Sequence, residues 1–309
     1  MSLLSVILAS ILSLFNFSQL AASSASFFSF GGSGSAHVLF AGDMMFDRTI
    51  RTAAEREGDD FLLSCIDQVL LAPENDLVVA NLEGPITGKP SVSIGSKPGE
   101  ARNFVFTFPI STAQLLKDHQ IDLVNLGNNH ILNFGYSGVQ STVSTLEEVG
   151  VAYFGDPITD KVVYKTISGV PLAFISYNEF SDDGAKTAAA VTMIQIKSAK
   201  SVGFLPVVYT HWGLEYVRTA PQYIRDRAHA FVDAGAIAVI GSHPHVVQDS
   251  ETYKGALIYY SLGNFVFDQY FQESVRNGLL IRVAFNSEGV ESVEEIPVKL
   301  NRDRTVCPL

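Results

Sequence analysis

Short apolar runs separated by more polar segments recur along most of this chain. They lie at residues 38–41, 77–80, 123–126, 172–176, 205–209, 237–240 and 257–260. Most of the runs contain no polar residue, which is typical of strands that are buried on both faces of a parallel sheet. Because helical patterns lie between them, the chain is predicted to be an α/β protein.

Helix and loop signals fill the segments between these runs. Helices are predicted at 111–119, 137–149 and 221–235, where Ser or Thr caps, a first-turn Pro and terminal Gly residues mark the ends. Residues 279–300 alternate apolar and polar positions, which predicts exposed strands. Residues 89–102 are rich in Gly, Pro, Ser and Lys, so we expect a long surface loop, either a functional rim or a plain connection.

The N-terminal stretch differs from the rest of the chain. No charged side chain precedes Asp43, and residues 3–15 are apolar over the length of a signal-peptide core, although a basic n-region is missing. We expect a signal peptide or N-terminal membrane anchor at 1–25, a Ser/Gly-rich linker at 26–36 and the folded domain at 37–309. These features favour an exported cell-envelope protein, membrane-anchored or secreted. The alternative is a cytoplasmic protein with an incidental leader.

Composition narrows the range of partners. A hydrophobic content of 47% over 309 residues is enough for one large core. The net charge of −11 serves solubility and argues against nucleic acid or an anionic membrane surface as the main partner. Cys65 lies in a helical apolar pattern, which predicts core packing. With only Cys307 besides it, the chain has no predicted disulfide framework and no thiolate zinc site.

Side chains that bind metal ions stand where several of the apolar runs end. They are Asp43, Glu83, Asn129, His130, His211, His243 and His245, with Asn264 after the last run. In open α/β sheets, ligands bind just past the carboxyl ends of the strands, so we expect these side chains to meet there. Imidazole nitrogen with carboxylate and amide oxygen fits one or two divalent ions, most naturally Mn, Fe or Zn, rather than a structural thiolate site.

His243 and His245 are two residues apart, and on a continuing strand their rings would face opposite ways. Pro244 between them is expected to hold His243 extended and to begin a turn that aims both rings at neighbouring ions. Two hydrogen-bonded loop histidines are the alternative. His211 ends another run, and we expect a ligand there rather than a core histidine.

The other candidates also have plainer interpretations. A glycine precedes Asp43 and would let the backbone approach an ion, yet Asp also caps helices. Glu83 lies in a turn-like sequence where an exposed Glu would be ordinary. Arg48 is a candidate for a forked contact with phosphate or carboxylate, or else a solvated helix residue. Asn129 offers an amide ligand and His130 a proton for a leaving group, although this segment also suits a turn.

Six motifs follow one another in a fixed order along the chain. They are Gly42-Asp43-Met44-Met45, Asn81-Leu82-Glu83-Gly84, Asn128-Asn129-His130, His211-Trp212-Gly213, Gly241-Ser242-His243-Pro244-His245 and Ser261-Leu262-Gly263-Asn264-Phe265. Together they resemble the CapA family of bacterial capsule and poly-γ-glutamate synthesis proteins. That family is similar to a branch of the calcineurin-like metallophosphoesterases. The resemblance covers residues 38–268.

The resemblance implies a four-layer αββα sandwich of the metallo-dependent phosphatase kind, with the metal site at the strand ends. It assigns the catalytic role to His130, and metal-binding roles to Asp43, Asn129, His211, His243 and His245.

Two positions depart from the metallophosphoesterase pattern. Met45 stands where that pattern has a ligand His, and Asn81 and Glu83 stand near the place of its bridging Asp. The resemblance therefore implies one of two functions. One is a metal-dependent hydrolase of a phosphoester or amide-like bond, with Arg48 and Asn264 orienting the substrate. The other is a non-catalytic accessory that binds an anionic polymer, in either case within a capsule-synthesis complex at the membrane.

Overall fold

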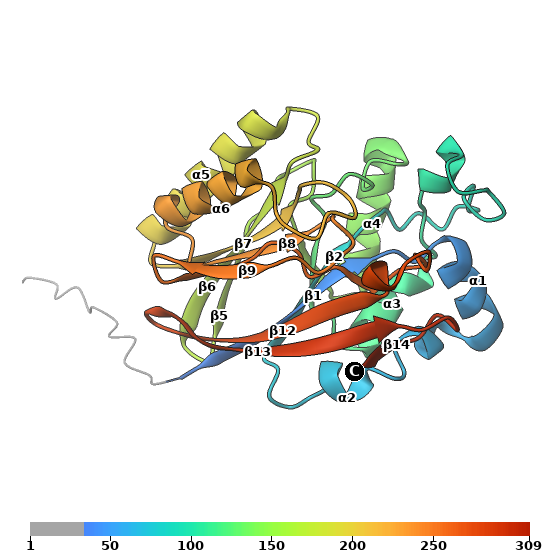
Figure 1. Cartoon of the computed structure of the whole chain (residues 1–309), viewed down its shortest axis with the longest axis horizontal. Coiled ribbons are helices and arrows are strands. Elements are labelled where there is room, and N and C mark those ends of the chain that lie inside the picture. Colours follow the sequence, from blue (N-terminus) through green and yellow to red (C-terminus); the bar gives the residue numbers. More distant parts are fainter. Residues whose placement is uncertain (1–33) are drawn as a thin grey trace, which may run out of the picture. The chain divides into compact units, whose positions relative to one another are not determined.

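The computed structural model describes residues 34–309, in which two β-sheets lie face to face (Figure 1). The larger sheet has the order β14-β13-β12-β1-β2-β3-β4, with β11 paired to β1, and the smaller has the order β5-β6-β7-β8-β10-β9. Strands of the larger sheet are β1 (Ala36–Met44), β2 (Leu77–Leu82), β3 (Leu123–Asn125), β4 (Ala152–Phe154), β11 (Asn264–Val266), β12 (Asn277–Asn286), β13 (Gly289–Leu300) and β14 (Val306–Pro308). Those of the smaller are β5 (Val163–Ile167), β6 (Val170–Asn178), β7 (Leu205–His211), β8 (Ala238–Ser242), β9 (Ser250–Tyr253) and β10 (Ala256–Tyr259).

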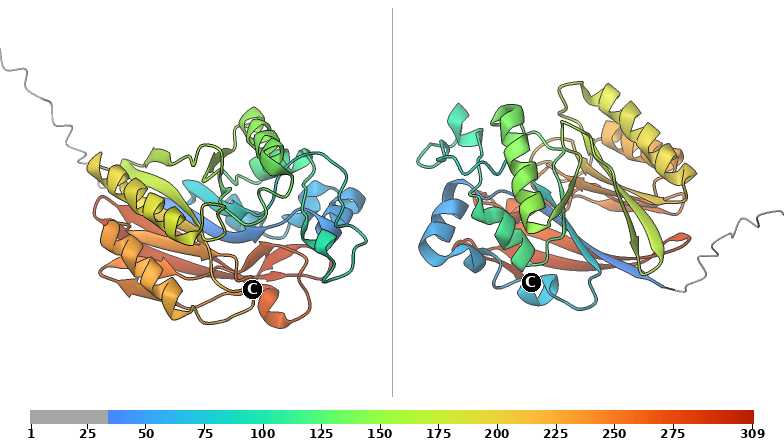
Figure 2. Two further views of the ribbon diagram at one scale, coloured as in Figure 1. Left: turned by 90° about the horizontal axis from the view of Figure 1, so that it is seen from above. Right: turned by 180° about the vertical axis from the view of Figure 1, so that it is seen from behind.

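Helices cover the outer face of each sheet, as Figure 2 shows. Against the larger sheet lie α1 (Arg48–Glu57), α2 (Asp67–Leu70), α3 (Ser111–Asp118) and α4 (Gly135–Val149). Against the smaller sheet, α5 (Ala185–Ser201) and α6 (Gln222–Ala234) lie side by side. Short 3₁₀ turns are η1 (Asp59–Leu62), η2 (Ala101–Phe104) and η3 (Glu273–Val275).

Strand β1 shows how the sequence builds these layers. Val38 and Phe40 point into the core between the two sheets, whereas Leu39 and Ala41 point into the core between the larger sheet and its helices. A third core lies between the smaller sheet and α5 and α6. The order of layers is helices, sheet, sheet, helices, so the predicted four-layer αββα sandwich is confirmed.

All seven predicted strands are present. The three predicted helices are α3, α4 and α6, and the bounds of these helices lie within two residues of those predicted. The predicted exposure of residues 279–300 was wrong for β12. Leu280 and Ile281 are both 0% exposed, because helices cover one face of this strand and the smaller sheet covers the other. Residues 89–100 form no helix or strand, as expected of a loop. The predicted leader and most of the linker lie outside the described residues.

Cys65 and Cys307 form a disulfide, with their Cα atoms 5.0 Å apart. The prediction of core packing for Cys65 was therefore wrong, since its side chain lies at the surface between η1 and α2. The bridge joins this segment to β14 across 242 residues of sequence. Within residues 34–309, no helix is both long and apolar enough to cross a bilayer.

Candidate metal centre

Carboxyl ends of parallel strands from both sheets meet at one end of the sandwich. They carry Asp43 (β1), Glu83 (after β2), Asn129 (after β3), His211 (β7), and His243 and His245 (after β8). Five of these side chains are in residues at most 4% exposed, and Asn129 is partly buried. The fold thus brings together the six ligands predicted from the sequence.

Glu83 is a fully buried carboxylate, and neither of its oxygens has a hydrogen-bond partner among the described residues. Its Oε1 lies 3.8, 3.9 and 3.7 Å from the Nε2 atoms of His130, His211 and His245. Burial and the nearby Asp43 carboxylate raise the pKa of Glu83 well above its usual range. Since a buried charge without a partner is costly, this arrangement favours a bound cation. The alternative of an exposed Glu83 is wrong.

Two other separations match those of ligands that share an ion. Asn129 Oδ1 and His243 Nδ1 lie 2.9 and 3.2 Å from His211 Nε2. Ligand atoms about 2.1 Å from one ion lie about 3.0–3.4 Å apart at octahedral or tetrahedral angles. Two groups of residues each offer potential ligand atoms that all lie within 4.8 Å of one another, and Glu83 belongs to both groups. The residues present therefore fit a divalent ion.

Contacts on both ring nitrogens position His211. Ser242 Oγ, whose hydroxyl donates to the Thr210 carbonyl at 2.8 Å, lies 3.0 Å from His211 Nδ1, and Asn81 Nδ2 lies 3.2 Å from the same nitrogen. His211 Nε2 points toward Asn129 and Glu83. Such outer hydrogen bonds orient the imidazole ligands of metal sites.

Asn264 fixes His245 in the same way. Its amide nitrogen donates to Val275 O at 2.9 Å and to Gln269 Oε1 at 3.1 Å, so its oxygen faces His245 Nδ1 at 2.9 Å and accepts from it. His245 therefore presents Nε2 to Glu83. Asn264 is 1% exposed, and this burial suits a residue that orients His245. The predicted contact of Asn264 with substrate stays a prediction.

Asp43 is held as a carboxylate by four neighbours. Asn81 Nδ2 donates to one oxygen at 2.8 Å, and the His243 backbone N–H donates to the other at 3.0 Å. Burial by itself would raise the pKa of Asp43, but the neighbouring His245 and His211 imidazoles and the Asn81 amide hold that pKa well below its usual range. Asn81 is thus a donor that orients a ligand.

The turn at His243 and His245 differs from the one predicted. His243 has φ 95° and His245 has φ 57°, so the expectation that Pro244 keeps His243 extended was wrong. Positive φ in a residue with a side chain costs about 1–3 kcal/mol and persists where the surroundings enforce it. Here the conformation at His243 aims its N–H at Asp43 and brings both rings to the centre.

Glycines let neighbouring strands close in behind the ligands. A Cβ on Gly42 would lie 1.9 Å from the carbonyl oxygen of Gly263, and one on Gly241 would lie 1.9 Å from that of Tyr260. At Gly42 the group that approaches is the chain just before β11, and the approach of the Gly42 backbone to an ion stays a prediction. This contact fixes the end of β1, which carries Asp43.

His130 lies beside the centre. Asn133 Oδ1 accepts from the Phe106 backbone at 2.7 Å and lies 3.1 Å from His130 Nδ1, so that nitrogen is the donor and Nε2 faces Glu83. Burial lowers the pKa of His130 to about 4. The ring also packs on Phe106, with centroids 4.2 Å apart.

Arg48 begins α1, next to this ring. Its Nη2 bonds to Asp268 at 2.5 Å and its Nη1 to Asn103 Oδ1 at 3.2 Å, so protein groups already occupy its fork. Its predicted contact with a substrate anion stays a prediction. The helix cap is Asp47, whose carboxylate accepts from the Arg48 N–H at 2.7 Å, so the alternative role of Asp43 as a cap is wrong.

Met45 does not reach the centre. It is 0% exposed, packs in the core between the larger sheet and its helices, and accepts the Asp47 N–H on its sulfur at 3.0 Å. The side chain gives the centre no nitrogen, so the histidine ligand that is missing from the sequence pattern has no replacement from Met45 in the structure.

Comparison with known proteins identifies the family. Residues 37–269 match the family described as "Bacterial capsule synthesis protein PGA_cap". The chain belongs to this family. Its predicted place among the CapA proteins is confirmed.

Several curated relatives match most of the chain. The PGA biosynthesis protein CapA of Bacillus subtilis is 29% identical over 285 residues, which covers 87% of this chain and 73% of that protein. The capsule biosynthesis protein CapA of Bacillus anthracis is 28% identical, covering 85% and 67%. A probable polyglutamine synthesis accessory protein of Mycobacterium tuberculosis is 27% identical, covering 76% and 69%.

Among solved structures, the protein TT1561 of Thermus thermophilus aligns with 84% of this chain and 97% of its own, with 9% identity and a TM-score of 0.45.

Proposed function

We propose that this protein acts in capsule or poly-γ-glutamate synthesis at the cell envelope as a divalent-metal-dependent hydrolase. The role in polymer synthesis is supported by the family and by the names of the Bacillus relatives. The hydrolase activity is supported above all by Glu83, a buried carboxylate without hydrogen-bond partners that faces three imidazole nitrogens.

Six residues would hold one or two ions, most naturally Mn, Fe or Zn: Asp43, Glu83, Asn129, His211, His243 and His245. A divalent ion supplies charge neutralisation at the substrate and makes water nucleophilic at neutral pH. His130 Nε2 faces the same space and is placed to protonate a leaving group. An anionic substrate beside this ring would raise its low pKa toward neutrality.

The substrate is a phosphoester or a bond resembling an amide, in or near an anionic polymer. A chain of net charge −11 repels such a polymer, so local positive charge has to compensate. Metal ions at Glu83 would supply it. We also propose that the protein works with a capsule-synthesis complex at the membrane.

Metal analysis and turnover test the hydrolase proposal together. Wild type, a His243→Ala/His245→Ala double variant and a His229→Ala control would be assayed for bound metal and for hydrolysis of bis(p-nitrophenyl) phosphate. His229 binds Glu251 on another part of the surface, so its loss should change neither. We expect metal and turnover in wild type and control only. A wild type without metal, or equal turnover in all three, would contradict the proposal.

A non-catalytic accessory is the second candidate, and Met45 is the observation that favours it, because one expected nitrogen ligand is absent. Complementation of a capsule-deficient strain separates the two functions. If a folded His130→Ala variant restores capsule as well as wild type does, the accessory function holds. If it restores none, the hydrolase holds.

Export is supported by the Cys65–Cys307 disulfide, since disulfides persist mainly in oxidising compartments. Fractionation of the tagged full-length chain, with thiol labelling, tests this. We expect an oxidised protein in the envelope or medium; a reduced cytosolic protein would contradict export.

A further inference from the structure

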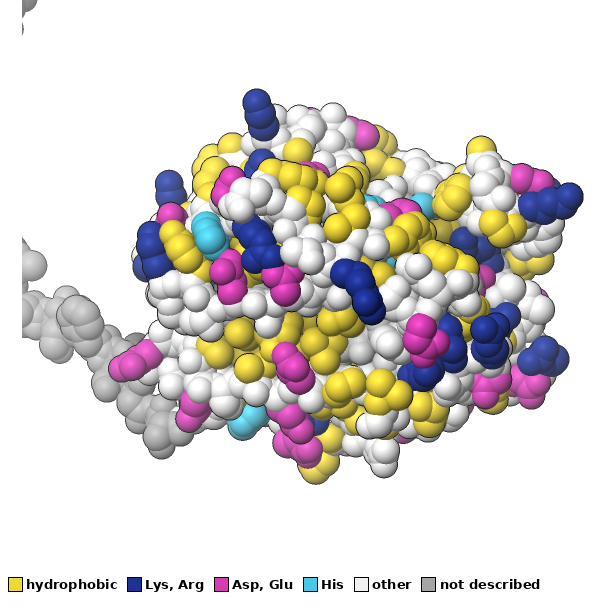
Figure 3. All heavy atoms as spheres, viewed as in Figure 1, with side chains coloured by type: hydrophobic (Ala, Val, Ile, Leu, Met, Phe, Trp, Pro, Cys, Tyr) yellow, Lys and Arg dark blue, Asp and Glu magenta, His cyan; other side chains and the backbone are white. Residues whose placement is uncertain are grey.

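An apolar cleft of about 420 Å³ lies beside the metal centre, between α1, the 93–104 segment and residues 268–271. Four large hydrophobic side chains converge on it although each is well exposed: Ile94 (41%), Phe104 (46%), Tyr216 (38%) and Phe271 (65%). Figure 3 shows hydrophobic side chains on the projecting segment that Figure 1 colours teal. Apolar groups gathered in one hollow are typical of a ligand site.

The cleft and the metal centre share a wall. The Tyr216 ring, which lines the cleft, lies 6.2 Å from the His245 ring. Arg48, at the base of the cleft, lies over Phe106 and Phe267, the rings that pack against His130 and His245. The cleft therefore lies next to the metal centre, with the Tyr216 ring between it and His245.

The cleft carries no net charge. Its only ionisable carboxylate and its only cation among the described lining residues are Asp268 and Arg48, and they bind each other at 2.5 Å. Their charges cancel, and the Nε of Arg48, which has no hydrogen-bond partner, is buried. A polyanion passing along the cleft would meet no uncompensated cation.

The hydroxyl groups of the cleft are also engaged. All four lining Ser and Thr side chains donate their protons to protein acceptors: Thr49 to Asp268, Thr52 to Arg48 O, Ser93 to Val105 O and Ser96 to Ser93 O. What remains to recognise a ligand is mainly apolar and aromatic surface.

The cavity on the other side of the centre has a different character. Its lining includes Asn129 and four carboxylates (Asp156, Asp160, Asp182 and Asp183), together with the side chains of Ile131, Leu132, Tyr136 and Phe180. The four carboxylates make this cavity less favourable for a neutral apolar group than the apolar cleft, which has a single, paired carboxylate.

We propose that the apolar cleft binds a neutral apolar group of the substrate, about the size of an aromatic ring, next to the anionic group held at the metal centre. The inference rests on the proposed function, because it assumes that an anion binds at Glu83. It assigns Phe104, Tyr216 and Phe271 as residues that determine specificity.

Calorimetric titration of the metal-loaded full chain with benzylphosphonate and methylphosphonate tests the pairing of the two sites. Burial of a ring should make benzylphosphonate bind about tenfold or more tightly than methylphosphonate. A Phe104→Ala/Phe271→Ala double variant should reduce this ratio to about one and leave methylphosphonate affinity unchanged. Tyr136→Ala, which removes an exposed ring from the other cavity, should keep the wild-type ratio.

Equal affinities for both phosphonates in wild type, or a ratio unchanged in the double variant, would overturn the proposal. A neutral probe keeps this outcome distinct from failure of the metal centre. Benzyl alcohol, titrated by saturation-transfer NMR without metal, should bind wild type about fivefold or more tightly than the double variant. If it does so while neither phosphonate binds, the proposed function fails and the apolar cleft stands. If it binds both proteins equally, the cleft proposal fails.

Discussion

Replacement of Glu83 by Gln should have opposite effects with and without metal. The substitution keeps the shape of the side chain and removes its charge. In the metal-free protein the carboxylate is buried without a hydrogen-bond partner, and its pKa is raised by burial and by Asp43. A raised pKa means that the folded state disfavours the charged form. At neutral pH this reduces stability, because the unfolded chain ionises freely.

The size of the effect follows from the burial of Glu83. An unpaired buried polar group costs about 1–3 kcal/mol, and about 1 kcal/mol shifts Tm by about 2–4 °C in domains of 150–250 residues. A Gln amide in the same place is still a buried polar group, so the substitution removes only part of this cost. Glu83→Gln should therefore raise Tm by about 2–6 °C in EDTA. At a metal concentration of 100 Kd the wild type gains about 2.7 kcal/mol, which the variant should lose.

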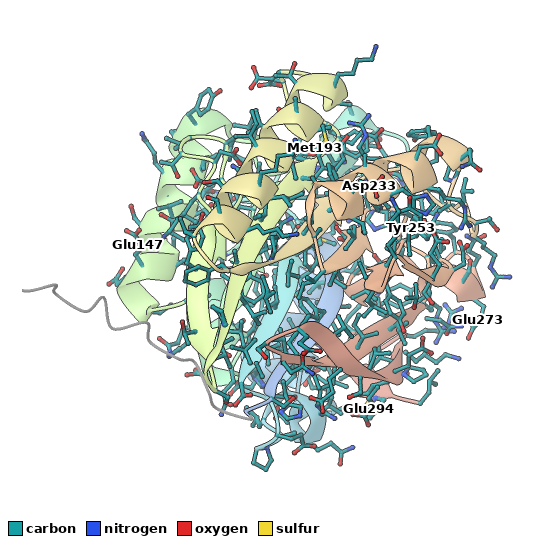
Figure 4. All side chains as sticks on the ribbon, turned by 90° about the vertical axis from the view of Figure 1, so that its left-hand side faces the viewer. Glu147, Met193, Asp233, Tyr253, Glu273 and Glu294 are labelled. Atoms are coloured by element: carbon teal, nitrogen blue, oxygen red, sulfur yellow. A yellow bond between two sulfur atoms is a disulfide. The ribbon has the colours of Figure 1, made fainter. Side chains whose placement is uncertain are left out.

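Differential scanning calorimetry in EDTA and in Mn²⁺ measures both effects. The variant should melt above wild type in EDTA and below it in Mn²⁺. Glu147→Gln on α4, an exposed residue labelled in Figure 4, is the control and should melt like wild type in both buffers. A Glu83→Gln protein that is less stable in EDTA, and that keeps the full Mn²⁺ shift, would refute this reasoning.

Three further predictions follow from other parts of the structure. Cys65→Ser should lower the free energy of unfolding, measured in urea, by about 2–5 kcal/mol. Reductant should lower the urea midpoint of the wild type to that of the variant. A variant as stable as the oxidised wild type would contradict this. Metal-free protein should lose stability as pH falls from about 6.5 toward 4, measured by urea midpoints. Burial lowers the pKa of His130 to about 4, of His243 to about 3 and of His211 well below its usual range, so in this pH range these three histidines bind protons in the unfolded chain and not in the folded protein. The raised pKa of Glu83 opposes this with a single proton bound in the folded state. A flat profile would refute it. Asn264→Ala should weaken Mn²⁺ binding about 10–100-fold in a calorimetric titration, and unchanged affinity would exclude its role in orienting a ligand.

The residues of the candidate metal centre could be predicted because each lies near the end of a buried strand. Asp43 and His211 follow unbroken apolar runs, and parallel strands bring such ends together whatever the details of packing. Glu83 shows the limit of this reasoning. Its turn-like sequence suited an exposed residue, and only the facing of the two sheets buries it among imidazoles.

The residues that orient the ligands could not be predicted from local sequence. Asn264 is 19 residues from His245, and Ser242 is 31 from His211, so their hydrogen bonds depend on how β11 and β8 lie beside other strands. The spacing of Cys65 and Cys307 likewise carries no signal of pairing. Strand β5 was not predicted, since it is a short edge strand with alternate exposure.

Anomalous diffraction from crystals grown with Mn²⁺ tests the central claim most directly. We expect a peak within coordination distance of the Glu83 carboxylate and of His211 or His245, and for two ions a second peak about 3.5–4 Å away on the other side of that carboxylate. Crystals of protein with bound Mn²⁺ that show no peak beside Glu83, or a peak only elsewhere, would contradict the metal centre.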